Sequence, residues 1–392
     1  MSSRNGLRWR RWAAVVPVVG AIAALSACGS GDDNGSTSTG GGSATTGDTL
    51  VDGIAGKLAP YEGDGKVGFS IYNGAVPHWN KVDIPELKKC LSQYAPNVEL
   101  VTADPKGDAK TQTSQVQSML SQGVNVLLLT PVAPTPTAIL RAAKQNDVPV
   151  IDYVNPVVEA EEGDVVALVG DGPVPIGTAQ AQWILDQNYP KGTKIALVNG
   201  DLATQYAQLM RRAQMEVLQP ALDSGDLVLV GDKGAKNWDG AEAEKQMSAI
   251  LVAHPDVGAV IAGADFLASG VISALKTINR AGEVDIIGLD ADPIGVQNIL
   301  LGNQTATVIK SSYNEMAVGC AAVIAALKGE EPPEDVFTDT WSENTAPIPF
   351  RDTPVDVVER DTLQKAFDWN LLTEEEACEG LPASVGEPCS SE

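Results

Sequence analysis

Basic residues are scarce in this chain, and their scarcity narrows the range of partners. The 392 residues contain 27 Lys and Arg against 51 Asp and Glu, which gives a formal net charge of −24 at neutral pH. Four of the arginines lie within the first eleven residues, so the rest of the chain is more acidic still. Such a surface repels nucleic acid and anionic lipid headgroups. We therefore expect no nucleic-acid partner.

The motifs of several enzyme classes are also absent. The run at 170–172 has no third glycine where a dinucleotide-binding loop needs one, and neither a Walker loop nor a Gly-x-Ser-x-Gly elbow occurs. Residues 290–295 begin like a calcium loop, but Ile294 stands where an oxygen ligand is needed. Neither His78 nor His254 has metal-ligand spacing with a cysteine. We expect no catalysis, cofactor or metal, although a glycosidase built on two carboxylates stays open as an alternative.

The apolar run at 13–25 is too short to span a bilayer. It follows a cationic front and precedes Leu25-Ser26-Ala27-Cys28, a pattern typical of an export signal. Small residues before a cysteine resemble the lipobox of bacterial lipoproteins, and this resemblance implies that Cys28 is acylated and becomes the new N-terminus. We expect a signal peptide at 1–27, a lipid anchor at Cys28 and an extracytoplasmic body. The alternative is a cysteine that happens to follow an ordinary signal peptide.

The four remaining cysteines are Cys90, Cys320, Cys378 and Cys389. An exported location permits disulfides, and four thiols allow three pairings. Cys378 and Cys389 are close together in a Gly/Pro-containing tail, which favours a local bridge. Cys320 lies in a run of small apolar residues and is expected to be a buried packing residue, while the role of Cys90 stays open.

Two segments have compositions that disfavour a packed core. Residues 28–63 are rich in Gly, Ser, Thr and Asp, so we expect a flexible tether. Residues 373–392 are acidic, and we expect them to be loosely ordered.

Between these segments, short β-rich runs alternate with helical patterns, which predicts βαβ units and an α/β fold with parallel sheets. Predicted strands lie at 66–71, 98–101, 124–130, 149–152, 165–169, 194–198, 227–230, 259–262, 285–289, 306–309, 347–350 and 355–358. Asp292-Pro293 is expected to be a helix N-cap followed by a first-turn proline.

Several motifs follow one another in a characteristic order and spacing. They are Lys66-Val67-Gly68-Phe69, Val76-Pro77-His78-Trp79, 112–122, 124–131, Arg211-Arg212-Ala213-Gln214-Met215, Gly231-Asp232 before Trp238, Gly288-Leu289-Asp290-Ala291-Asp292, Gly302-Asn303-Gln304-Thr305 and Val308-Ile309-Lys310. In this order and at these spacings, the motifs resemble those of the periplasmic sugar-binding proteins of ABC importers, closest to the xylose-binding and ribose-binding branch. The resemblance covers residues 66–335 continuously and the segment to 370 less clearly.

The resemblance implies two Rossmann-like lobes joined by a three-crossover hinge, as in type I periplasmic binding proteins, with a solute held at the carboxyl ends of the strands. We expect an N-terminal lobe at 64–170 and 311–343 and a C-terminal lobe at 171–310 and 344–372. The crossovers are expected near Asp171, near Ser311 and at 343–348. A solute that contacts both lobes favours the closed form, which a membrane permease would recognise.

The resemblance and the positions of the strand ends together predict the ligand-binding residues. Trp79 and Trp238 are expected to sandwich a sugar ring, with His78 beside the first. The alternatives are that Trp79 is a core residue packing the first helix and that His78 is solvated. Asp290 follows a strand and is expected to accept hydroxyl hydrogen bonds. Lys310 is expected to donate to the ligand, or alternatively to form a salt bridge at the hinge.

The resemblance places further polar contacts at Asp152 and Asp265, and at both positions this sequence departs from the family pattern. No arginine follows Asp152, so Asn155 is expected to take part of its role, and Asp265 stands as either a ligand contact or a helix cap. The other candidates are Asn73, Gln205 and Tyr206, and Asn73 could equally cap a turn.

The sequence therefore predicts a monomeric, lipid-anchored solute-binding protein of an ABC importer that captures a monosaccharide or a similar neutral polar solute. The abundance of acids and the lack of a clear arginine disfavour an anionic solute. A ligand-binding sensor that signals to a receptor is the alternative outside transport.

Overall fold

The computed structural model describes residues 53–54, 56–133, 136–158, 160–343 and 346–389. The predicted signal peptide, Cys28 and the tether as far as residue 52 lie outside the described residues. Within the described ranges, no helix is long and apolar enough to cross a membrane.

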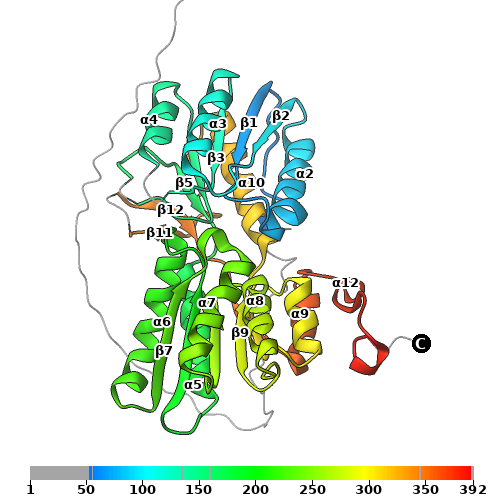
Figure 1. Ribbon diagram of the computed structural model, residues 1–392. Helices are drawn as coiled ribbons and strands as arrows, with labels where there is room; N and C mark the ends of the chain where they lie inside the picture. The colour runs from blue at the N-terminus through cyan, green and yellow to red at the C-terminus, as the bar shows by residue number, and fades with distance from the viewer. Residues whose placement is uncertain (1–52, 55, 134–135, 159, 344–345, 390–392) are drawn as a thin grey trace, which may run out of the picture. The chain divides into compact units, whose positions relative to one another are not determined.

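Among the described residues, seven strands form a first sheet, in the spatial order β11-β12-β5-β4-β3-β1-β2 (Figure 1). All of its pairings are parallel except that of β11 with β12. The strands are β1 (Gly65–Ser70), β2 (Val98–Ala103), β3 (Val126–Leu129), β4 (Val150–Tyr153), β5 (Ala167–Val169), β11 (Asp339–Trp341) and β12 (Ile348–Arg351).

A second sheet has the order β13-β10-β9-β8-β6-β7, and only the pairing of β13 with β10 is antiparallel in the part of the chain described. Its strands are β6 (Thr193–Asn199), β7 (Leu227–Gly234), β8 (Ala259–Ala262), β9 (Asp285–Leu289), β10 (Ala306–Ile309) and β13 (Asp356–Glu359). The predicted α/β fold with two mainly parallel sheets is confirmed, as are the predicted strands. β11 was not anticipated.

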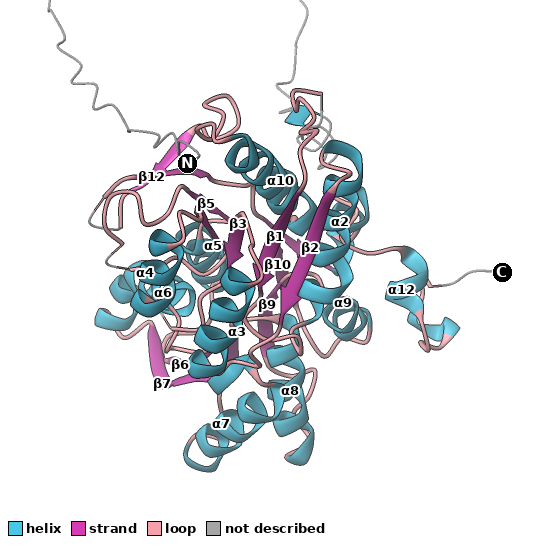
Figure 2. Cartoon of the chain, turned by 90° about the horizontal axis from the view of Figure 1, so that it is seen from above, coloured by secondary structure: helices cyan, strands magenta, loops and turns pink. Residues whose placement is uncertain are grey.

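Helices lie on both sides of the strands (Figure 2). The helices that belong to the lobe of the first sheet are η1 (Trp79–Asp83), α2 (Ile84–Tyr94), α3 (Ala109–Ser121), α4 (Thr137–Gln145) and α10 (Ser312–Lys328). Those that belong to the lobe of the second sheet are α5 (Pro173–Asp186), α6 (Gln205–Asp223), η2 (Lys236–Trp238), α7 (Gly240–Ala253), α8 (Asp265–Thr277) and α9 (Pro293–Leu300). The C-terminal region adds η3 (Arg360–Thr362), α11 (Gln364–Asp368), α12 (Glu374–Cys378) and η4 (Ala383–Val385).

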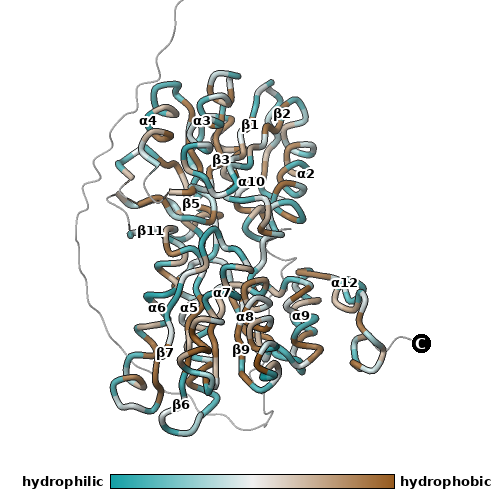
Figure 3. Tube along the Cα trace, in the orientation of Figure 1, coloured by the Kyte–Doolittle hydropathy of each residue, from teal (hydrophilic) through white to brown (hydrophobic). Residues whose placement is uncertain are grey.

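Continuous apolar sequence explains the central strands. Every residue of β3, β8 and β10 is buried, as expected for parallel strands that helices cover on both faces. Figure 3 shows hydrophobic segments along the strands and along the inner helix α5. Side-chain caps then fix where helices begin: Asp108 accepts a hydrogen bond from the Thr111 amide at the start of α3.

The chain passes from one sheet to the other between β5 and β6, between β10 and β11, and between β12 and β13. The third passage therefore lies at 352–355, whereas the sequence placed it at 343–348 and assigned 344–372 to the second lobe. The reason is that β12 pairs with β5, which keeps it in the first sheet. A short apolar strand carries no mark of the sheet that it will join.

Both ends of the predicted body are packed more extensively than composition indicated. Ile54 is buried in the first lobe's core, and Lys328 donates to the Ala59 carbonyl, so the expected tether does not reach residue 63. In the tail, Ala377 is fully buried and a capping box begins α12 at Thr373. The expected loose order is therefore wrong for the described part of this tail.

Two disulfides are present among the described residues. Cys378 pairs with Cys389, which confirms the predicted local bridge. Cys320 is buried as predicted, but it also forms a disulfide with Cys90 that joins α10 to α2 across a sequence separation of 230. Sequence spacing could not reveal this pairing because it depends on how the two helices pack.

Candidate functional site

The carboxyl ends of the parallel strands from both sheets surround a pocket with an empty volume of about 460 Å³. We call it the inner pocket. Its lining residues are Tyr72, Val76, His78, Trp79, Val154, Asn155, Tyr206, Trp238, Ala264, Phe266, Leu289, Asp290 and Lys310.

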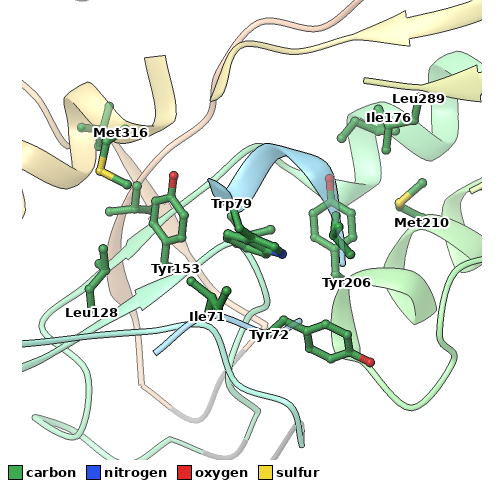
Figure 4. Packing of buried hydrophobic residues seen from close by; sticks show 14 of the residues in the cluster. Ile71, Tyr72, Trp79, Leu128, Tyr153, Ile176, Tyr206, Met210, Leu289 and Met316 are labelled. Atoms are coloured by element: carbon green, nitrogen blue, oxygen red, sulfur yellow. The ribbon is translucent and has the colours of Figure 1, made fainter. Parts of the chain in front are cut away.

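Aromatic side chains make up much of the inner pocket. Trp79 packs against Tyr153 and His78, with ring centroids 6.1 Å and 4.0 Å apart, and its indole nitrogen points toward the side of Tyr206 (Figure 4). In the second lobe, Trp238 packs against Tyr206 with their ring centroids 6.2 Å apart. The buried Nε1 of Trp79 has no hydrogen-bond partner among the described residues. A buried donor without a partner is costly, so this atom is suited to bond a ligand.

Strained backbone is concentrated around the inner pocket. Val154, Trp238 and Asp290 adopt φ values of 65°, 53° and 100°, in the left-handed half of conformational space that side chains disfavour. Such conformations persist only where the surrounding structure enforces them, and they often mark functional sites. Here the strain lies at three residues that line the pocket from different strand ends.

One end of the inner pocket is charged. The Nζ of Lys310, which is 5% exposed, lies 3.3 Å from Glu315 Oε1, 3.5 Å from Asp171 Oδ2 and 3.7 Å from Asp290 Oδ1. Burial by itself would lower the pKa of Lys310, but the neighbouring carboxylates raise it overall. Burial raises the pKa of Asp171, and Lys310 partly offsets that increase. Lys310 is therefore a cation held in the pocket wall and a salt-bridge partner at the hinge.

His78 is positioned by a buried carboxylate. Its Nδ1 lies 2.5 Å from Asp83 Oδ2, and Tyr153 Oη donates to Asp83 Oδ1 at 2.6 Å. These contacts fix the orientation of the imidazole beside Trp79.

Contacts between the two lobes border the inner pocket. Tyr72 Oη, at the end of β1, donates to Asp201 Oδ2 after β6 at 3.0 Å. Burial, followed by the Asp201 charge, raises the pKa of Tyr72 above its usual value. Asn73 donates to the Asn237 carbonyl at 3.4 Å. The lobes thus meet directly at this edge.

Seven of the eleven predicted ligand-binding residues lie together in the lining of the inner pocket. They are His78, Trp79, Asn155, Tyr206, Trp238, Asp290 and Lys310. Four others are not among the lining residues: Asn73, Asp152, Gln205 and Asp265.

Two of those four are buried carboxylates with structural partners. Asp152 accepts a hydrogen bond from the Val157 amide at 2.6 Å and holds the loop after β4. Asp265 accepts from Gln304 Nε2 at 2.6 Å and Thr307 Oγ1 at 3.0 Å. Asp265 is also not a cap, since Ala264 holds the N-cap position of α8. Burial raises the pKa of both well above the usual range.

The other two lie near the pocket but face elsewhere. The Asn73 amide is used in the contact with Asn237 and in accepting from the Ala75 backbone. Gln205 is the first residue of α6, and the next residue, Tyr206, lines the pocket instead. The predicted cap Asp292 holds the N-cap position of α9, but its side chain makes no capping hydrogen bond.

Sequence reasoning missed Tyr72, Val154 and Phe266, each immediately beside a residue that it did select or in the same loop. A position just after a strand could have identified Tyr72, which follows β1, and Val154, which follows β4, whereas Phe266 lies in the first turn of α8. Selection by polarity favoured the neighbouring Asn73, Asp152 and Asp265.

A second, wider cavity adjoins the inner pocket, with an empty volume of about 1230 Å³. We call it the outer chamber. His78, Asp290 and Lys310 line both cavities. The other outer-chamber residues are Lys81, Val82, Ala291, Asp292, Pro293, Ser312, Tyr313, Asn370, Leu371, Leu372, Thr373 and Glu376.

Neither cavity has the composition of a metal centre. No group of three or more His, Cys, Asp or Glu side chains placed to hold a metal ion occurs in the described ranges. The inner pocket instead combines aromatic surfaces with a few hydrogen-bonding groups at one end. That combination suits a small solute with an apolar face and a polar edge.

Comparisons with known proteins agree with this geometry. A family model described as "Periplasmic binding protein domain" matches residues 67–331. The D-xylose-binding periplasmic protein of Escherichia coli is 31% identical over 303 residues, covering 76% of this chain and 88% of that protein. The xylitol-binding protein of Mycolicibacterium smegmatis is 28% identical over 315 residues, covering 77% and 86% respectively.

A solved structure shares the fold. It is an ABC transporter solute binding protein from Clostridium phytofermentans with bound β-D-glucose, at a TM-score of 0.71 and 23% identity, covering 80% of this chain and 99% of that one. The extent of the family match and the identity to the Escherichia coli protein place the sequence in the same group. This chain is a member of the periplasmic binding protein family.

Proposed function

We propose that this protein is the extracytoplasmic solute-binding component of an ABC importer and captures a monosaccharide or a similar neutral polyol in the inner pocket. The observation that carries the proposal is the inner pocket itself, where aromatic rings from both lobes face a charged end formed by Asp290 and Lys310. Relatives that bind xylose and xylitol support the same class of solute.

Each part of the inner pocket has a role in this proposal. Trp79 and Trp238 contact the apolar faces of the ring, and the Trp79 indole N–H donates to a ring or hydroxyl oxygen. Asp290 accepts from hydroxyl groups, while Lys310 and Asn155 complete the polar edge. Because the ligand contacts both lobes, its binding favours the arrangement in which they meet.

Transport and anchoring extend the proposal beyond the pocket. The protein is exported, acylated at Cys28 and held at the membrane as a monomer that delivers its solute unaltered to a permease. The sequence around Cys28 and the importer named in the structural neighbour support this. Replacing Cys28 with serine is expected to release the protein from membranes, as assayed by fractionation and mass spectrometry of the N-terminus. Retention of the serine variant would contradict acylation at this residue.

Isothermal titration and thermal shift with D-xylose, D-ribose, D-glucose, xylitol and myo-inositol test the binding function. A ligand at 100 times its dissociation constant should raise the free energy of unfolding by about 2.7 kcal/mol. At least one of these solutes is expected to bind, and Asp290→Ala is expected to abolish binding without unfolding the protein. Exposed Asp361→Ala is the matched control and should bind normally.

Absence of binding across the panel would contradict a monosaccharide or polyol site. Unchanged affinity in Asp290→Ala would remove Asp290 from that site. Because the family comprises solute-binding proteins, chemical conversion is not expected. Incubation of bound ligand followed by chromatography checks that the solute is recovered intact.

A further inference from the structure

The inner pocket and the outer chamber share part of their lining. His78, Asp290 and Lys310 line both, which places these side chains at the boundary between them. The outer chamber is the larger of the two, with an empty volume of about 1230 Å³ against about 460 Å³ for the inner pocket, space open to solvent included. A monosaccharide in the inner pocket would leave the outer chamber unused.

The C-terminal tail forms part of the wall of the outer chamber. Thr373 and Glu376 line the chamber, and they begin α12 through a reciprocal capping box. The tail is tied down by the Cys378–Cys389 disulfide and by Gln297, which donates to the carbonyls of Glu376 and Glu379. Such reinforcement fixes α12 against α9 (Figure 1), whose first residue, Pro293, lines the outer chamber.

The lining of the outer chamber is mainly polar. Lys81, Ser312, Tyr313 and Thr373 offer hydrogen-bond donors and acceptors, and Asp292 and Glu376 add carboxylates. Leu371 and Leu372 provide an apolar strip beside them. Hydroxyl groups along one edge of a sugar ring and C–H groups on its face would find partners on this surface.

Resting on the sugar-binding function proposed above, we propose that the natural ligand is larger than a monosaccharide: a glycoside whose first sugar fills the inner pocket and whose second unit occupies the outer chamber. Asp290 and Lys310 contact the unit in the inner pocket at the boundary, and the linkage passes beside them. The tail serves as the wall that holds the second unit. The surplus of carboxylates around the chamber favours a neutral second unit over a uronic acid.

The test compares each monosaccharide that binds with its O-glycosides by isothermal titration on the full mature protein. Suitable probes are D-xylose with xylobiose, and D-glucose with cellobiose, maltose and an aldobiouronic acid. A neutral disaccharide is expected to bind at least tenfold more tightly than its monosaccharide, and the uronic acid is expected to bind more weakly than the neutral disaccharides. Disaccharides that bind no more tightly than a monosaccharide would overturn this inference while leaving the sugar-binding function intact.

A variant locates the second unit. Glu376→Gln is expected to lower disaccharide affinity at least threefold with monosaccharide affinity unchanged, because Glu376 lines only the outer chamber. Glu374→Gln, in the same helix but outside the cavity lining, is the matched control. Tight disaccharide binding that Glu376→Gln leaves unaltered would place the second unit elsewhere and overturn the assignment. Failure of every monosaccharide and disaccharide to bind would refute the proposed function itself.

Discussion

The inner pocket and the outer chamber share three residues but differ in how their walls are made. The inner pocket is lined largely by aromatic and apolar side chains at strand ends, several of them on strained backbone. The outer chamber is lined mostly by polar side chains, partly from a tail that a short disulfide holds in place. The difference indicates that strand ends set the inner pocket, while the C-terminal tail contributes to the wall of the outer chamber.

The two cavities also differ in their charge environment. In the inner pocket, the ammonium group of Lys310 forms ion pairs with the buried carboxylates of Asp171 and Glu315, which balance its charge. In the outer chamber, Lys81 and Glu376 are exposed, and solvent screens them. Changes to the inner pocket should therefore affect both stability and binding, whereas changes to the exposed side chains of the outer chamber should affect binding of large ligands alone.

The largest effect is expected for Lys310→Met. Removing this cation leaves Asp171 and Glu315 buried without their partner, which typically costs about 3–5 kcal/mol. Urea denaturation should show that loss, and sugar binding should disappear. Lys245→Met, which removes an exposed surface pair with Glu242, is the control and should change stability by less than about 1 kcal/mol. Equal stability of the two variants would mean that the hinge charges do not depend on Lys310.

A smaller effect is expected for Trp79→Phe. The substitution keeps an aromatic ring but removes the unpartnered indole N–H, so one hydrogen bond to the ligand is lost. We expect affinity for the bound monosaccharide to fall about five- to tenfold, corresponding to about 1–1.4 kcal/mol. Titration of Trp238→Phe provides the comparison, because that change mainly reduces aromatic area. Full affinity in Trp79→Phe would show that this residue contributes through its ring alone.

Removing the tail disulfide with Cys378→Ser and Cys389→Ser should act on the outer chamber only. The closed loop is short, so the loss is expected to loosen the tail locally rather than to unfold the lobes. Disaccharide affinity is expected to fall about threefold through this added ordering cost, with monosaccharide affinity unchanged. Calorimetry of both ligands checks this, and parallel losses for both would show that the two cavities are not independent.

Asp292→Asn is expected to change the pH dependence of stability. Burial, with the Asp290 charge second, raises the pKa of Asp292 to about 7. The unfolded chain releases this proton near its usual value of about 4, so the folded state binds more protons between about pH 4 and 7. Asp292 therefore lowers the free energy of unfolding as pH rises through that window.

Urea denaturation between pH 4 and 8 measures this slope. Asp292→Asn is expected to lose less stability than the parent protein over the interval. Some slope should persist, because burial also raises the pKa of Asp152, Asp171 and Asp265. The exposed control Asp361→Asn should leave the profile unchanged. Identical profiles for Asp292→Asn and the parent would rule out this contribution.

Sequence patterns located the loops of the site more reliably than the side chains within them. Each loop after β1, β4 and at the start of α8 was identified, yet the pocket uses Tyr72, Val154 and Phe266 in place of the selected Asn73, Asp152 and Asp265. Neighbouring residues at a strand end point in different directions, and backbone angles such as that of Val154 decide which one faces the pocket. Polarity by itself does not encode that direction.

Periodicity and strand spacing were sufficient to predict an α/β fold with parallel strands, because these depend on local sequence and on burial of apolar runs, whereas the division into two sheets was predicted from the family resemblance. The short apolar strand β12 joined the first sheet, and Cys90 paired with Cys320, only through contacts between segments far apart in the chain. The outer chamber likewise exists because the tail packs on α9 beside residues of both lobes. Such contacts are set by three-dimensional packing, which no local pattern specifies.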